Sequence, residues 1–78
     1  MIVLDLHGLT VPEALKLIQT TVMDPKNKNQ QYIEVIHGFN SGDELKRLCS
    51  HHSNLRCKRI KKVTLKLNNP GASLLWLK

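Results

Sequence analysis

The feature that most constrains the fold is a pattern that occurs twice: a short apolar strand ends in His-Gly and leads into a helix. The pattern runs through residues 4–8, LDLHG, and again through residues 35–38, VIHG. Two parallel strands with adjacent C-terminal ends would bring both turns to one edge of a sheet, where open α/β sheets bind ligands. We therefore expect a phosphate-handling site at this edge.

Length and composition predict one small domain spanning residues 1–78. Hydrophobic residues make up 41% of the 78 residues, which is enough for a single compact core. No apolar run approaches the ~20 residues of a membrane span, and Met1 leads directly into a strand rather than into a signal peptide. Cys49 and Cys57 do not make a disulfide framework and fit a reducing compartment. We expect a cytoplasmic protein without membrane contact.

Charge is distributed unevenly along the chain. The formal net charge is +6, and no acidic residue follows Glu44. A C-terminal half whose charged residues are all basic attracts polyanions, most simply nucleic acid. The alternative is that these charges only form a solvated surface that keeps the protein in solution. The predicted nucleic-acid contacts are Lys46, Arg47, Arg59, Lys61, Lys62 and Lys66.

The first half of the chain reads as strand, helix, strand. Residues 2–6 alternate as in a half-buried strand, and Asp5 and His7 share its polar face. Thr10 and Glu13 form a reciprocal capping pair before apolar residues at helical spacing. The polar stretch 24–30 is a connection only, and residues 32–36 form a second strand parallel to the first.

The loop before the second helix is the predicted phosphate-binding element, with Gly38, Asn40, Ser41 and Gly42 as its residues. Its glycines and asparagine tolerate positive φ, so several backbone N–H groups can point at one anion. Ser41 and Glu44 repeat the capping signature. The acids after Gly42 weaken the prediction because they already satisfy the helix dipole, and an ordinary strand-to-helix turn is the alternative.

Two antiparallel strands are predicted to complete the sheet. Residues 59–67 form the third strand, with Val63, Leu65 and Leu67 facing the core, and residues 68–71 form a turn. Residues 72–77 form a last strand in the sheet interior. The predicted fold is therefore α/β in composition, an α+β two-layer sandwich of order β-α-β-α-β-β. Both helices cover one face of a mixed four-stranded sheet, and the other face is partly open.

Two further groups of side chains allow more than one interpretation. The open face would present Tyr32 beside lysines, which suits stacking and backbone contacts to a single strand. Trp76 could join it, but the only tryptophan of a small domain more often lies in the core, which we favour. A zinc site could be drawn from Cys49, His51, His52 and Cys57. It lacks a paired Cys-x-x-Cys spacing, so we favour a frayed helix end with buried thiols.

Three segments together resemble the Smr (small MutS-related) domain along essentially the whole chain: residues 4–14, residues 36–38, and residues 70–78. The resemblance implies a two-layer fold similar to the C-terminal domain of translation initiation factor three. It also implies nucleic-acid binding and, in several branches, metal-assisted or metal-independent cleavage of DNA or RNA. By the family's motifs, Asp5 and His7 occupy the positions linked to cleavage, and His37 and Gly38 those of a second, glycine-rich motif. Asn40 stands where a glycine is usual.

Phosphodiester cleavage requires an activated nucleophile, stabilisation of the phosphoryl oxygens and a proton for the leaving group. We predict His7 as the base, oriented by Asp5, and His37 as the acid. The alternative for His37 follows from its strand parity with Ile33 and Val35, which would turn it towards the helices to hold the loop. Alternatively, Asp5 and His7 hold a divalent ion such as Mg or Mn that polarises water.

The resulting hypothesis is a small endonuclease acting on RNA or DNA. The alternative is a non-catalytic nucleic-acid-binding module, and a third candidate is an interaction domain that docks on an acidic partner or on the ribosome.

Overall fold

The computed structural model describes residues 2–38 and 43–78, which form the predicted order of strands and helices. Two short 3₁₀ helices, η1 and η2, were not predicted. The elements are β1 (Ile2–Asp5), α1 (Val11–Met23), η1 (Pro25–Asn27), β2 (Tyr32–Ile36), α2 (Glu44–Leu48), η2 (His52–Leu55), β3 (Ile60–Lys66) and β4 (Asn69–Leu77).

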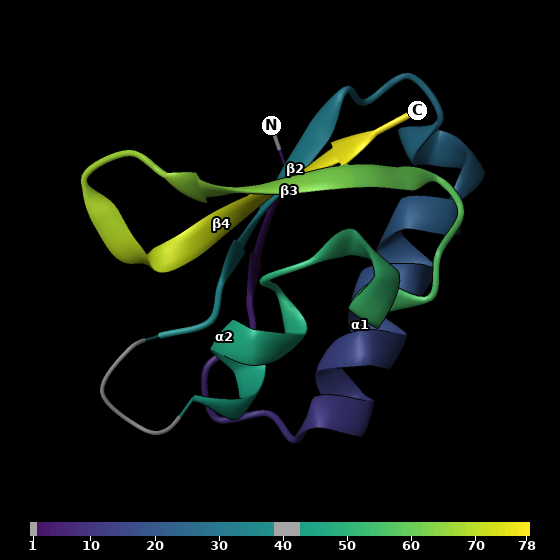
Figure 1. The fold of residues 1–78 in the computed structure, drawn as a ribbon. Coiled ribbons are helices and arrows are strands. Elements are labelled where there is room, and N and C mark those ends of the chain that lie inside the picture. Colours follow the sequence, from purple (N-terminus) through teal and green to yellow (C-terminus); the bar gives the residue numbers. More distant parts are fainter. Residues whose placement is uncertain (1, 39–42) are drawn as a thin grey trace.

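The described strands form a mixed four-stranded sheet in the order β1-β2-β4-β3. β1 and β2 are parallel, whereas β4 runs antiparallel to both of its neighbours. The helices pack on one face of this sheet (Figure 1). The predicted two-layer fold and the interior position of the last strand are therefore confirmed. The likeness to initiation factor three stays a prediction.

α1 begins where the sequence predicts. The Thr10 side chain accepts a hydrogen bond from the Glu13 N–H at 3.3 Å, and the Glu13 carboxylate accepts one from the Thr10 N–H at 2.9 Å. Ala14, Ile18 and Val22 on the helix are fully buried against the sheet. Capping and the apolar stripe thus act together to fix this helix on the core.

α2 begins differently from the prediction. Its N-cap is Asp43, whose side chain makes no capping hydrogen bond. Ser41, the predicted capping residue, lies outside the described residues. The predicted apolar stripe is confirmed, because Leu48 and Cys49 are buried and Leu45 packs against the same core.

The end of β3 contradicts the predicted core positions of two leucines. Leu65 is 63% exposed and Leu67 is 86% exposed. β3 is an edge strand with an irregularity between Leu65 and Lys66, and its hairpin with β4 extends beyond the helices (Figure 1). The turn also differs: Asn68 has the left-handed φ of 64°, and β4 already begins at Asn69. The predicted turn at 68–71 is therefore displaced towards the N-terminus.

Trp76 lies on the open face, so its predicted place in the core is wrong. Its partners across the sheet are Tyr32 on β2 and Lys62 on β3. Leu75 and Leu77 are the β4 residues that point towards the helices, and both are buried. Because side chains alternate along a strand, the residue between these leucines must face the other way.

Arg59, one of the predicted nucleic-acid contacts, has a structural role. Its guanidinium donates hydrogen bonds to the carbonyl oxygens of Val22 at 2.6 Å, Asn27 at 2.8 Å and Lys28 at 2.5 Å. These carbonyls lie at the end of α1 and at the end of η1. Arg59 therefore joins the chain just before β3 to that region, and these bonds occupy its guanidinium.

We expect Arg59→Met to lower the free energy of unfolding by about 2 kcal/mol, because it removes charge-assisted hydrogen bonds to several carbonyls. Urea unfolding followed by circular dichroism measures the change. Lys58→Met is the matched control, because Lys58 is exposed and carries the same charge. Equal stability of the two variants would contradict the structural role of Arg59.

Candidate active site

The two His-Gly turns lie side by side at one edge of the sheet. Asp5 pairs with Ile36 in the parallel register, and the Leu6 N–H donates to the Ile36 carbonyl at 2.8 Å. A Cβ atom placed on Gly38 would lie 4.0 Å from the Cβ of His7. The parallel strands thus bring together the two segments that the sequence pattern identifies.

Asp5 and His7 form a local pair at the end of β1. Asp5 Oδ1 lies 2.5 Å from His7 Nδ1 and also accepts the His7 backbone N–H at 3.1 Å. The exposed fractions of the two side chains are 53% for Asp5 and 70% for His7. The imidazole is therefore accessible from solvent without any rearrangement of the core.

The pair has an electrostatic consequence for Asp5. The side-chain hydrogen bond from His7, followed by the bond from its backbone N–H, lowers the pKa of the Asp5 carboxyl. Asp5 is then a carboxylate at neutral pH. Such an acceptor favours the tautomer in which His7 carries its proton on Nδ1, which leaves the Nε2 lone pair available to accept a proton.

His37 is placed differently from His7. It is only 2% exposed, its Nδ1 lies 2.9 Å from the Gly38 carbonyl oxygen, and its Nε2 lies 2.9 Å from Ser73 Oγ. Both ring nitrogens are engaged inside the protein, so this geometry does not suit the predicted role as acid. His37 instead holds the second turn in place. Sequence reasoning missed Ser73, whose only signal is a hydroxyl within an apolar strand.

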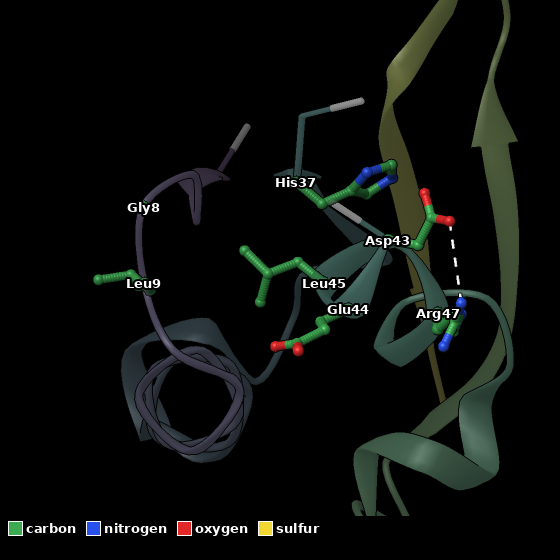
Figure 2. A pocket seen from close by; sticks show the side chains of 7 residues that line it. All are labelled: Gly8, Leu9, His37, Asp43, Glu44, Leu45 and Arg47. Atoms are coloured by element: carbon green, nitrogen blue, oxygen red, sulfur yellow. Dashed lines mark ion pairs between the residues drawn. The ribbon is translucent and has the colours of Figure 1, made fainter. Parts of the chain in front are cut away.

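A pocket of about 540 Å³ lies beside these turns. Figure 2 shows that its lining residues come from the β1–α1 turn, the end of β2 and the start of α2. Arg47 lines it, but so do the carboxylates of Asp43 and Glu44, and Arg47 lies 3.8 Å from Asp43. This part of the wall therefore offers little net positive charge. Gly38 has the expected positive φ of 78°, whereas Asn40, Ser41 and Gly42 lie outside the described residues, so the phosphate loop stays a prediction.

The predicted basic contacts occupy different surroundings. Lys46, Arg47 and Lys61 are exposed. Lys62 lies over the Trp76 ring, and Lys66 forms an ion pair with the buried Glu34 at 2.8 Å.

The four residues of the possible zinc site do not converge. His51 stacks on His52 with ring centroids 4.6 Å apart, and its Nδ1 accepts the Ser53 N–H. Burial raises the pKa of the Cys49 thiol to about 11, which disfavours a thiolate ligand. Within residues 2–38 and 43–78, no group of three or more potential ligands is arranged to hold a metal ion.

The Asp5–His7 pair offers few ligands for a divalent ion such as Mg or Mn. Its donors are one carboxylate and one imidazole, and Oδ1 of the carboxylate already contacts His7. Magnesium prefers near-octahedral oxygen ligands. The described donor set does not fit a metal held chiefly by protein ligands, and we derive no step through one.

Comparison with known proteins gives the family. The sequence model of the Smr domain matches residues 4–73. The chain belongs to the Smr family. Smr domains are a family with nucleic-acid binding and nicking activity. No curated protein matches the chain.

A solved Smr domain has the same fold. The Smr domain of MutS2 from Thermus thermophilus superimposes with a TM-score of 0.76 at 22% sequence identity. The match covers 100% of this chain and 99% of that chain. No helix in the described part of this Smr domain is long and apolar enough to cross a membrane.

We expect His7→Ala to raise the pKa of Asp5 towards the ordinary value, because it removes the side-chain hydrogen bond while the backbone N–H remains. Carboxyl ¹³C shifts recorded against pH measure the change. His51→Ala, at an exposed histidine elsewhere, should leave the Asp5 titration unchanged. An Asp5 pKa that is identical in wild type and His7→Ala would show that the pair does not form in solution.

The lowered pKa also sets a pH dependence of stability. The pKa of Asp5 is lower in the folded state than in the unfolded state. The contribution of Asp5 to the free energy of unfolding is therefore fully present when the pH is above the unfolded pKa. It is lost as the pH falls through the folded pKa.

Proposed function

We propose that this Smr domain is an endonuclease that cleaves phosphodiester bonds of RNA or DNA, with His7 as the general base and Asp5 as its orienting carboxylate. The observation that carries the proposal is the exposed Asp5–His7 pair, which lies beside the second His-Gly turn. Membership of a family with nicking activity supports it. Cytoplasmic location and ribosome docking stay predictions.

In the proposed reaction, His7 Nδ1–H donates to Asp5 and Nε2 takes a proton from the nucleophile. The nucleophile is water, or the 2′-hydroxyl where the substrate is RNA. Its oxygen forms a bond to phosphorus while the bond from phosphorus to the leaving oxygen breaks. The Asp5 carboxylate stabilises the imidazolium that forms. Because His37 is buried, we assign the proton of the leaving oxygen to solvent.

Charge on the phosphoryl oxygens must be stabilised by other groups. The Gly38 N–H already donates to the Gly71 carbonyl, so the proposed cradle is formed by the backbone N–H groups of Asn40, Ser41 and Gly42. Arg47 is the basic side chain that lines the adjoining pocket. Exposed Lys46 and Lys61 contribute to the attraction of the polyanion over a longer range.

The second candidate is a nucleic-acid-binding module without catalysis. The carboxylates of Asp43 and Glu44 favour it, because they line the pocket where a phosphate would be held. Like charges at this position weaken phosphate binding and thus transition-state stabilisation. The same scaffold and basic surface would still bind nucleic acid.

We expect the purified protein to nick supercoiled plasmid or to cut structured RNA. His7→Ala should slow cleavage by about 10²- to 10⁴-fold, the usual contribution of a general base, and Asp5→Asn should slow it less than His7→Ala. Gel assays on RNA and DNA of matched sequence measure the rates, and His51→Ala is the control. Unchanged cleavage in the Asp5→Asn, His7→Ala double variant would refute the assignment.

Two further readouts separate the alternatives. Cleavage that survives chelation and leaves a cyclic phosphate on RNA supports the acid–base route. Absent cleavage together with retained, salt-sensitive binding supports the non-catalytic module.

A further inference from the structure

Two aromatic rings lie together on the open face of the sheet, away from the helices. Tyr32 and Trp76 are directly opposite each other on β2 and β4, and their ring centroids are 5.1 Å apart at an interplanar angle of 45°. Both residues are half-buried, so part of their surface meets solvent. We name Tyr32 and Trp76 the aromatic platform.

Neighbouring side chains fix the orientation of the platform. The Trp76 indole N–H donates a hydrogen bond to Thr64 Oγ1 at 2.9 Å. Thr64 lies on β3, so the edge strand of the sheet satisfies the polar atom of the ring. Tryptophan N–H groups usually find a hydrogen-bond partner, and here the partner is an exposed threonine on the edge strand, so the ring is held at the surface of the open face. Thr64 was not identified from the sequence, because it lies two positions along β3 from Lys62, the residue opposite Trp76, and only the folded sheet brings its hydroxyl to the indole N–H.

The charges around the platform favour an anionic ligand. Lys62 Nζ lies 5.3 Å from the centroid of the Trp76 ring, and Lys66 neutralises Glu34 through their ion pair. Glu34 is itself only 5% exposed, so its carboxylate is covered. The accessible charge next to the rings is therefore positive.

We propose that the aromatic platform stacks unpaired bases of a single-stranded nucleic acid and guides that strand along the sheet to the Asp5–His7 pair. This deepens the proposed function, on which it rests, by naming the substrate class as single-stranded segments. Tyr32 and Ile36 mark the two ends of β2, and Ile36 is paired with Asp5. Four residues of strand span roughly 13 Å, a distance covered by about four nucleotides stacked at ~3.4 Å each.

Charge complementarity selects this occupant. A base offers a π-face to the rings, and the phosphates on either side of it can contact Lys62. The net charge of +6 attracts the strand as a whole. Paired bases in a duplex do not expose their faces, so a duplex cannot use the platform. A flexible lysine over an exposed ring is held only weakly, so Lys62 can leave the Trp76 ring for a phosphate when a base arrives.

Trp76 is the only tryptophan of the chain, which makes it a fluorescent reporter of its own contacts. The experiment titrates the Asp5→Asn, His7→Ala double variant, which prevents cleavage of the probe, with a 12-nucleotide single strand. The comparison probes are the same sequence as a duplex and an abasic strand of equal charge. We expect the single strand to quench Trp76 fluorescence and to bind most tightly, at one fixed salt concentration.

Substitutions separate stacking from packing. Trp76→Leu keeps an apolar side chain but loses the π-face, and should weaken binding of the labelled single strand by roughly 5- to 100-fold in anisotropy titrations. Trp76→Phe keeps a π-face and should lose less, and it serves as the readout if the leucine variant does not fold. Lys62→Gln should weaken single strand and abasic strand alike and reduce the salt slope by about 1.

The outcomes distinguish this proposal from the proposed function. Equal binding of the abasic and normal strands, or unchanged affinity in both Trp76 variants, overturns the platform even where cleavage occurs. Quenching together with weakened Trp76 variants supports it even where the wild type does not cleave. A fluorescence change that depends on protein concentration alone would assign the face to a second copy of the chain and overturn the proposal.

Discussion

Parallel pairing of β1 with β2 is the constraint on which the site depends. A one-residue shift of this register would turn Asp5 towards the helices and bury the carboxylate. The observed register pairs Asp5 with Ile36. The alternation of side chains in β1 explains this register, because Leu4 and Leu6 face the core while Val3 and Asp5 face away from it. Burial of the leucines thus determines where the acidic side chain lies.

The last strand links the two regions of the sheet to which we assign proposed functions. The Gly71 carbonyl of β4 accepts the N–H groups of His37 and Gly38 at 2.9 and 3.0 Å, and Ser73 contacts the ring of His37. At its other end the same strand carries Trp76 on the open face. An interior strand that is bonded on both sides is a rigid support, so the second turn and the aromatic platform keep a fixed separation.

Much of the fold could be predicted because local signals and burial agree. The capping pair at Thr10, the apolar stripe of α1 and the alternation in β1 all act within one element, and all are confirmed. The errors arise where the decisive contact is distant in sequence. Leu65 is exposed because the hairpin extends past the helices, and Arg59 is occupied by carbonyls about 30 residues earlier.

The candidate site follows the same division. Asp5 and His7 are two positions apart, so strand alternation was enough to place the two side chains together. His37 could not be assigned in this way, because Ser73 lies 36 residues away and only the folded sheet brings the two together. The parity of His37 with Ile33 and Val35 was the single signal in the sequence that it turns inward.

Exposure of the Asp5–His7 pair sets what the rest of the molecule must contribute. A base that is fixed only by a neighbouring carboxylate on an open surface abstracts a proton well, but it does not hold the phosphodiester in line. Positioning therefore has to come from contacts elsewhere on the substrate. The pocket beside His37 is lined by two carboxylates, which leaves the open face as the surface with the charge and the rings for this task. In a domain of 78 residues, the side of the sheet that the two helices leave uncovered is thus the part best suited to place a strand for cleavage.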